Sequence, residues 1–200
     1  MKGDFFERKA GSYDRSEARV QNVDNISGAI VKGADLRKSM RLMDFGSGTG
    51  LLLERIAPFV AGVTAVDISS SMNSQLAAKR SRLGCELEIL EIDLETADIE
   101  RTFDGIISSM TLHHIRDIDA LFAKFHRLLV PGGFIALADL DVEDGSFHTE
   151  DTGVHHLGFD REVLAGVAEK VGFKDVVVTK ASVVRKPQGD FPVFLLTASR

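Results

Sequence analysis

Apolar residues recur along this chain with two different spacings. Val20, Val23, Ile26 and Ile30 lie three or four positions apart, which predicts a helix over 17–31. Apolar positions with similar spacing predict further helices that begin near residues 51, 70, 118 and 163. Compact apolar runs, several rich in β-branched residues, predict strands at 41–45, 62–66, 87–93, 103–109, 134–138, 173–179 and 191–198.

The order of these elements predicts an α/β fold. Strands and helices alternate up to residue 138, a pattern typical of a doubly wound, mostly parallel sheet. Pro131-Gly132-Gly133 is expected to turn the chain into the fifth strand. The last two strands are joined by 185–190 without a helix, so they should form a C-terminal antiparallel hairpin. We therefore expect one domain over 1–200, built on a seven-stranded sheet.

The first strand runs into a glycine-rich turn with the sequence D-F-G-S-G-T-G. Gly46, Gly48 and Gly50 stand at alternate positions, where they allow a sharp turn and a close approach of the backbone to a ligand. The helix that follows presents its free N–H groups to the same place. The spacing differs from the dinucleotide fingerprint G-x-G-x-x-G, because Leu51 occupies the third glycine position. The turn is therefore predicted to bind the nucleoside part of a cofactor.

An aspartate ends or closely follows each of the first three predicted strands: Asp44, Asp67 and Asp93. Asp67 follows Asp44 by 67 − 44 = 23 residues. This is close to the interval of about 20 residues at which a strand-end acid reaches a ribose in nucleotide-binding α/β folds. Any one of these acids could simply cap a helix, but three after three apolar strands indicate a ligand site.

The glycine turn, the three aspartates, Pro-Gly-Gly before the fifth strand and the closing hairpin resemble a class I S-adenosylmethionine (SAM) dependent methyltransferase over nearly the whole chain. The resemblance implies a Rossmann-like methyltransferase fold, SAM as the cofactor and S-adenosylhomocysteine (SAH) as its product. It also implies a cofactor site at the following positions: Tyr13, Asp44, Gly46, Ser47, Gly48, Gly50, Asp67, Ile68, Met72, Asp93, Leu94 and Ser109.

The resemblance assigns a role to several of these residues. Asp44 would lie near the SAM amino group, Asp67 would hold the ribose hydroxyls and Asp93 would accept from the adenine amino group. Met72 would pack near the base, and Tyr13 would close over the cofactor. The expected segments are an N-terminal helical lid (1–40), a SAM-binding core (41–139), an acceptor-side loop (140–158), and a final helix with the antiparallel hairpin (159–200).

Three histidines are candidates for a catalytic base. His113 and His114 follow the fourth strand, over the usual ligand crevice of an open α/β sheet, and His148 lies in the long acidic loop. Histidine titrates near neutrality, which suits proton transfer from a phenol or an activated carbon acid. Packing or capping is the alternative role for each. The Asp and His residues of 139–158 have no spacing that enforces a metal site, and we expect none.

Composition narrows the choice of acceptor. The chain has 44% hydrophobic residues, a net charge of −6 and one cysteine, Cys85. The acidic charge disfavours binding to nucleic acid or an anionic membrane, and a single cysteine fits the reducing cytoplasm. The apolar runs are too short to span a membrane. These features predict a cytoplasmic protein, a monomer or homodimer, that acts on a small molecule.

The residues at the end of the fourth strand also favour a small-molecule acceptor. Ser108-Ser109-Met110-Thr111 stands where methyltransferases of nucleobase amino groups and protein glutamine carry [D/N]-P-P-Y. The chain is therefore more similar to quinone-pathway and natural-product methyltransferases, with the methylated O, C or N atom unresolved. Two alternatives remain: a non-catalytic subunit that supports a partner enzyme, and a nicotinamide-dependent oxidoreductase, which Leu51 disfavours.

Overall fold

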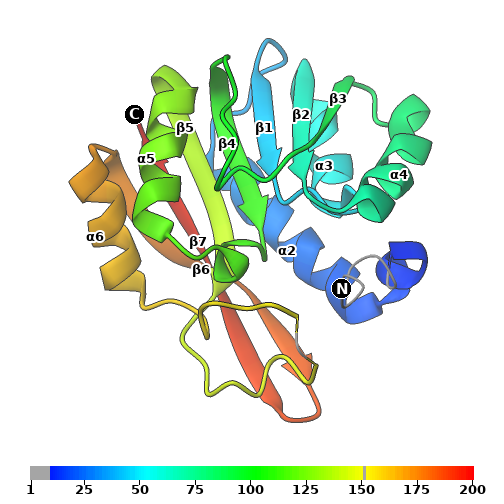
Figure 1. Cartoon of the computed structure of the whole chain (residues 1–200), viewed down its shortest axis with the longest axis vertical. Helices are drawn as coiled ribbons and strands as arrows, with labels where there is room; N and C mark the ends of the chain where they lie inside the picture. Colours follow the sequence, from blue (N-terminus) through cyan, green and yellow to red (C-terminus); the bar gives the residue numbers. More distant parts are fainter. Residues whose placement is uncertain (1–9, 151) are drawn as a thin grey trace.

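A computed structural model describes residues 10–150 and 152–200, so residues 1–9 of the expected N-terminal lid (1–40) lie outside the described residues. The strands are β1 (Arg41–Phe45), β2 (Gly62–Asp67), β3 (Glu86–Glu91), β4 (Phe103–Ser109), β5 (Leu129–Leu140), β6 (Lys174–Lys186) and β7 (Gly189–Ser199). They form one sheet in the order β3-β2-β1-β4-β5-β7-β6 (Figure 1). Strands β1 to β5 run parallel, and β7 is antiparallel to both β5 and β6. The predicted fold class is confirmed.

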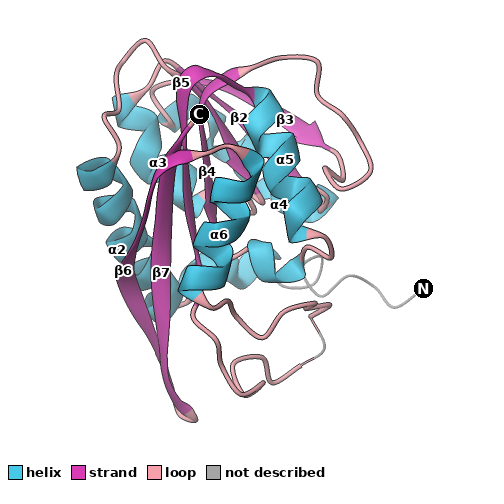
Figure 2. Ribbon diagram, turned by 90° about the vertical axis from the view of Figure 1, so that its left-hand side faces the viewer, coloured by secondary structure: helices cyan, strands magenta, loops and turns pink. Residues whose placement is uncertain are grey.

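Helices cover both faces of this sheet (Figure 2). The α-helices are α2 (Glu17–Gly33), α3 (Leu51–Ile56), α4 (Ser70–Lys79), α5 (Ile118–Leu128) and α6 (Arg161–Val171), and the 3-10 helices are η1 (Ala10–Arg15), η2 (Ala57–Phe59), η3 (Arg80–Arg82) and η4 (Leu112–His114). Four helices begin at a side chain that accepts a backbone N–H of the first turn: Ser16, Ser69, Asp117 and Asp160. Such caps satisfy donors that the helix itself leaves unpaired, and each stabilises its helix by about 1 kcal/mol.

The core lies in two layers, because successive side chains of a strand point to opposite faces. Leu42 joins the layer under α2 and α3, whereas its neighbour Met43 joins the layer under α5 and α6. Both residues are fully buried, as expected for a strand covered on both faces. Burying a side chain of this size contributes about 2 kcal/mol, so the pair fixes the register of β1 strongly.

The connection from β3 to β4 differs from the prediction. Residues 92–102 contain no helix, although we expected strands and helices to alternate without a break. Strand β3 also ends at Glu91, two residues before Asp93. Asp93 instead starts a turn, in which its carboxylate accepts from Glu95 N at 2.8 Å and its carbonyl accepts from Ala97 N at 2.8 Å. Aspartate forms such local turns readily, which explains the early end of the strand.

Two further boundaries were wrong. Strand β5 runs continuously from Leu129 to Leu140, so Pro131-Gly132-Gly133 lies inside the strand and does not form a turn before it. Phe103 of β4 pairs with Leu129, and an irregularity in the register accommodates the extra residues before Gly105 pairs with Phe134. The hairpin is also longer than expected, because ladder pairing between β6 and β7 extends to Lys186 and Gly189. Only Pro187 and Gln188 therefore form its tip.

Candidate active site

Two cavities of about 420 Å³ and 210 Å³ lie at the carboxyl ends of the parallel strands. The sheet order changes direction between β1 and β4, the usual place for a ligand in an open α/β fold. Figure 1 shows segments 141–150 and 152–160 and the tip of the β6–β7 hairpin beyond these strand ends. The cavities adjoin, because six residues line both: Tyr13, Gly46, Gly48, Ser109, Met110 and His114.

Most of the residues predicted for the site line these two cavities. Of the fifteen predicted cofactor-binding and catalytic residues, only Gly50 lines neither cavity. In addition to the shared residues, the larger cavity is lined by Asp44, Ser47, His113 and His148. The smaller cavity is lined by Asp67, Ile68, Met72, Asp93 and Leu94. Gly50 has a backbone role: it caps α3 with φ of 82°, and a Cβ there would come within 2.4 Å of Leu76 Cδ1.

The glycine turn between β1 and α3 has the left-handed geometry that glycine allows. Gly46 has φ of 69° and Gly48 has φ of 51°. A Cβ on Gly46 would lie 2.2 Å from Thr111 Oγ1, whereas a Cβ on Gly48 would meet open space. Gly46 therefore lets the turn pack against the β4 end, and Gly48 leaves room at the junction of the two cavities. Met110 is left-handed as well, with φ of 59°, a strained conformation of the kind that gathers at functional sites.

Asp67 ties the glycine turn to the start of α4. Its two carboxylate oxygens accept from Gly48 N and Ser69 N, each at 2.8 Å. The carboxylate therefore lies beside the backbone of both segments at the wall of the smaller cavity. A carboxylate in this position can also accept from two vicinal hydroxyl groups of a ribose. The nearby wall is apolar, with Met72 and Leu94 almost fully buried.

Asp44 is buried at the end of β1, and its Oδ2 has no hydrogen-bond partner. Burial, together with the charge of Asp67, raises the pKa of Asp44 to about 8. A buried carboxylate without a partner is costly, so this oxygen is suited to receive a cationic group from a ligand. The ammonium of an amino acid is such a group.

Other polar atoms around the larger cavity also lack partners. Among the described residues, six buried side-chain atoms have no hydrogen-bond partner, and five of them belong to residues that line this cavity. The five atoms are Asn22 Oδ1, Asp44 Oδ2, Ser47 Oγ, Ser109 Oγ and His148 Nε2. Buried polar groups are normally satisfied, so their concentration here points to a polar ligand that completes them.

The three candidate histidines meet in one cluster at the larger cavity. The ring of His113 lies 4.3 Å from that of His114 and 5.1 Å from that of His148, between ring centroids. His113 Nδ1 lies 2.6 Å from Asp139 Oδ1, and Asp139 Oδ2 accepts from His113 N at 3.2 Å. Burial works against the Asp139 charge, but the contacts with His113 hold the pKa of Asp139 below its usual value. Asp139 is therefore an ionised carboxylate that orients His113.

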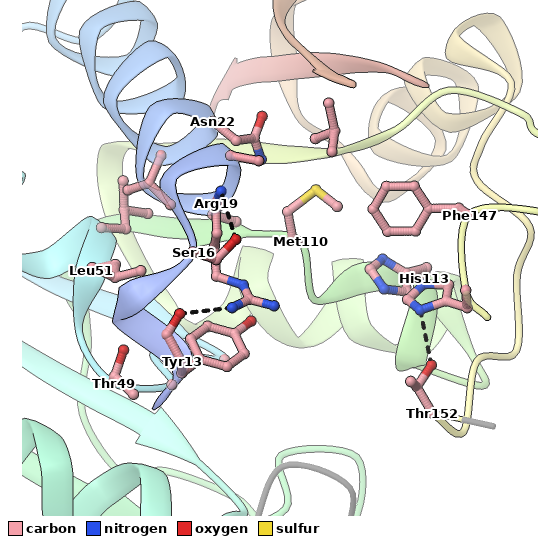
Figure 3. Close-up of a pocket in the computed structure, with 18 of the residues that line it drawn as sticks. Tyr13, Ser16, Arg19, Asn22, Thr49, Leu51, Met110, His113, Phe147 and Thr152 are labelled. Carbon is pink, nitrogen blue, oxygen red and sulfur yellow. Dashed lines mark hydrogen bonds between the residues drawn. The ribbon is translucent and has the colours of Figure 1, made fainter. Parts of the chain in front are cut away.

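The other two histidines are neutral near pH 7. Burial, with the charge of His113 beside them, lowers the pKa of both His114 and His148 to about 4. His148 Nδ1 also contacts Thr152 Oγ1 at 3.1 Å (Figure 3). A neutral imidazole with so low a pKa is a weak base, so neither His114 nor His148 is suited to accept a proton from an acceptor.

The segment before α2 closes one side of the site. Arg19 lies over the ring of Tyr13, 3.7 Å from its centroid, and Arg19 Nη1 donates to Tyr13 O at 2.7 Å (Figure 3). The adjacent Asp14 accepts from Thr49 Oγ1 at 2.5 Å and contacts the buried Lys79 Nζ at 2.6 Å. Side-chain contacts with the glycine turn and α4 thus hold Tyr13 at the junction of the cavities.

Several lining residues were missed from the sequence. They are Arg19, Asn22, Thr111, Phe147 and Lys186. Arg19 and Asn22 looked like ordinary polar positions of an amphipathic helix, and Lys186 looked like part of a surface turn. Their places depend on the packing of α2 against β6, where Asn25 Nδ2 donates to Ser182 Oγ at 3.1 Å. The contact between α2 and β6 joins residues far apart in the chain, so no local sequence pattern predicts it.

Two kinds of feature are absent from the described part of the chain. Residues 10–150 and 152–200 contain no group of three or more His, Cys, Asp or Glu residues arranged to hold a metal ion. Within the same ranges, no helix has both the length and the apolar character needed to cross a membrane.

The residues of the two cavities suit SAM. The unpartnered Asp44 carboxylate can receive its ammonium, and the Asp67 carboxylate can receive its ribose hydroxyls. The apolar wall around Met72 and Leu94 suits a flat base. The glycine turn keeps space open where the two cavities meet, because no Cβ stands at Gly48.

Comparison of the sequence with known proteins leads to one family. A methyltransferase domain family matches residues 42–133. An uncharacterized methyltransferase of Schizosaccharomyces pombe is 25% identical over 195 residues, which are 89% of this chain and 66% of that protein, just under two thirds of its length. An uncharacterized methyltransferase of Geobacillus kaustophilus is 30% identical over 194 residues, 85% of this chain and 87% of that protein. The malonyl-[acyl-carrier protein] O-methyltransferase of Geobacter sulfurreducens is 28% identical over 219 residues, 98% of this chain and 78% of that protein.

Solved structures share the fold. The methyltransferase in complex with the Haloferax volcanii activator Trm112 superposes with a TM-score of 0.80 at 14% identity, over 100% of this chain and 99% of that one. Haemonchus contortus phosphoethanolamine N-methyltransferase 2, bound to phosphomonomethylethanolamine and SAH, superposes with a TM-score of 0.71 at 18% identity, over 88% and 52%. With this fold and a 30% identical relative matched over most of both lengths, the chain belongs to the class I SAM-dependent methyltransferases.

Proposed function

We propose that this protein transfers a methyl group from SAM to a small-molecule acceptor. The observation that carries the proposal is the pair of adjoining cavities, one lined by Asp67, Met72 and Asp93 and the other by the histidine cluster, with Asp44 unpartnered near their junction. SAM in the smaller cavity and at the junction would leave most of the larger cavity to the acceptor.

The size of the larger cavity supports a small acceptor. Its volume of about 420 Å³ lies within the range of about 300–1,000 Å³ typical of small-molecule sites. Two similar proteins have names that specify acceptors: a malonyl group carried by acyl-carrier protein, and phosphoethanolamine. In both cases the group that is modified is small, which agrees with this cavity.

The roles of the chain's own residues follow from their contacts. SAM supplies an activated methyl group when bound, so the protein must mainly position the acceptor and exclude water. Because ionised Asp139 only accepts hydrogen bonds, His113 Nδ1 carries the proton between them, and Nε2 is the nitrogen that can accept a proton from the acceptor. We assign His113 as the general base, and His114 and His148 as neutral groups that shape its surroundings.

Isothermal titration with SAM, SAH and a nicotinamide nucleotide tests the cofactor. We expect binding of SAM and SAH and no measurable binding of the nicotinamide nucleotide. Preference for the nicotinamide nucleotide would instead support the oxidoreductase alternative. A control variant, Asp35→Ala, removes an exposed carboxylate that lines neither cavity and should leave the affinity for SAM unchanged.

A methyl-transfer assay with radiolabelled SAM and a panel of phenols, amines and carboxylic acids tests the activity. Turnover of at least one acceptor, lost in His113→Ala but not in His156→Ala, is the expected result. Tight SAM binding with no turnover, together with capture of a defined partner protein that restores it, would favour the supporting-subunit alternative.

A further inference from the structure

Two cations face the larger cavity from different parts of the chain. Arg19 is near the start of α2, and Lys186 is the last residue of β6. They come together because α2 packs along β6. Both side chains are partly buried, unlike Arg185, which also lines the cavity but is exposed and lies 3.9 Å from Asp190.

Each of these cations lies over an aromatic ring. Arg19 is 3.7 Å from the centroid of Tyr13, and Lys186 Nζ is 3.6 Å from the centroid of Phe147. Figure 3 shows Tyr13 with Arg19 on one side of Met110 and Phe147 on the other. Lys186 Nζ also donates to Phe147 O, and Arg19 Nη1 donates to Tyr13 O. Each head group keeps further N–H donors for a ligand, because these contacts occupy only part of its capacity.

No carboxylate among the described residues lies within ion-pair distance of Arg19 or Lys186. The charge of Glu143 acts on Lys186, but Glu143 Oε2 accepts from Gly145 N at 2.8 Å and from Phe147 N at 3.0 Å. Burial and the charge of Arg19 lower the pKa of Lys186, so the positive charges act on each other across the cavity. An anion between them would relieve this repulsion.

We propose that Arg19 and Lys186 form a binding site for an anionic oxygen group on the methyl acceptor, either a phosphate monoester or a carboxylate. The identification of the ligand as the acceptor rests on the proposed function, whereas the anion site itself rests on the two cations. Guanidinium and ammonium groups bind such oxygens with charge-assisted hydrogen bonds. Two facing cations match the charge of a phosphate monoester best. The aromatic rings beside them provide apolar contact for the rest of the molecule.

Three probes that share one ring separate charge from shape: phenyl phosphate, benzoate and phenol. Their affinities would be measured by isothermal titration, with and without saturating SAH. We expect phenyl phosphate to bind about tenfold more tightly than phenol, with benzoate between them. This preference should decrease as NaCl is raised, because salt screens partly exposed charges.

Charge-removing variants test the two residues. Lys186→Met and Arg19→Met should each lower the affinity for phenyl phosphate about five- to tenfold and leave the affinity for phenol within about twofold. Lys180→Met is the matched control on β6, and Lys32→Met is the control on α2, since both lysines are exposed and line neither cavity. Neither control should change the order of the probes.

Equal affinity for all three probes, or no binding of any of them, would overturn the proposal. An unchanged preference for phenyl phosphate in Lys186→Met and Arg19→Met would also overturn it. Failure of the proposed function gives a different pattern: no binding of SAH, while phenyl phosphate still binds in a manner that depends on Lys186. Binding of SAH without any preference among the probes would remove only the anion site.

Discussion

His113 Nδ1 lies 2.6 Å from Asp139 Oδ1, and both side chains are almost completely buried, at 2% and 0% exposure. Asp139 also accepts from the backbone N–H groups of His113 and Leu140, the latter at 2.7 Å. A carboxylate held in this way cannot turn away from the imidazole. The pair therefore fixes the orientation of His113 at the wall of the larger cavity.

Replacing Asp139 should weaken catalysis more than binding. Asp139→Asn keeps the size of the side chain but removes the carboxylate that accepts from His113 Nδ1. We expect kcat at neutral pH to fall about 10- to 100-fold, because the orientation and tautomer of the base are no longer fixed. SAM affinity measured by titration should stay within about twofold. An unchanged kcat would contradict the assignment of Asp139 as a positioning residue.

His114 and His148 should make the folded protein less stable in mild acid. Their folded pKa values of about 4 lie below the value of about 6.5 in the unfolded chain. The unfolded state therefore binds more protons, and the free energy of unfolding falls as the pH is lowered from about 6.5 to 4. Because both side chains are partly exposed, we expect a loss on the order of 1–2 kcal/mol for the pair.

Urea unfolding of the protein and of the double variant His114→Gln, His148→Gln at pH 7.5, 6 and 5 measures this contribution as the difference between the two proteins. The protein should lose stability relative to the double variant as the pH falls. Asp44, whose pKa of about 8 gives the opposite dependence, is present in both proteins, and the pKa of Asp139 is lowered, so its contribution is lost only at more acid pH. Equal slopes for the two proteins would show that the histidines are not held neutral.

Binding of SAM should release a proton from Asp44. The pKa of this carboxyl is about 8 in the free protein, raised by burial and by Asp67, so it is mostly protonated at pH 7. A bound ammonium would favour the carboxylate, so affinity should rise up to about tenfold between pH 6 and 7. Titration in two buffers of different ionisation enthalpy measures the proton release directly. Asp44→Asn should bind more weakly and release no proton.

Two glycines of the same turn should respond differently to alanine. Gly46→Ala forces a Cβ against the Thr111 side chain at a positive φ, so we expect the free energy of unfolding to fall by about 2–3 kcal/mol. Gly48→Ala meets open space and should cost only about 1 kcal/mol. It should nevertheless weaken SAM binding, because its methyl group would occupy the junction of the cavities. Denaturant unfolding and SAM titration of both variants separate the two effects.

Asp67→Ala should weaken SAM binding by about 1–3 kcal/mol, the scale of a lost charge-assisted hydrogen bond. The contacts with Gly48 N and Ser69 N add a second reason, since the variant also frees the turn that shapes the site. Asp67→Asn keeps one acceptor oxygen and should lose less. Unchanged affinity in the alanine variant would place Asp67 outside the cofactor site.

The order of elements and the acids at the strand ends were predictable because they depend on local chemistry. The burial of both Leu42 and Met43 reflects a sheet covered on both faces, which the compact apolar run 41–45 already indicated. The wrong strand boundaries depend on turn formation and on strand pairing, which the apolar pattern of a segment does not show. Strand β3 ends early because the Asp93 carboxylate forms a local turn with Glu95 N. Strand β5 begins before Pro131 because its pairing with β4 contains an irregular register.

By itself, the sequence determined the doubly wound sheet, the glycine turn and fourteen of the fifteen predicted residues that line the cavities, because strand ends of a parallel sheet must meet at one edge. Only the tertiary structure decided that Asp139 holds His113, that Asp44 stays unpartnered, and that Arg19 and Lys186 face one cavity. Those relationships join residues far apart in the chain. Their distances depend on how α2, β5 and β6 pack, which no local pattern encodes.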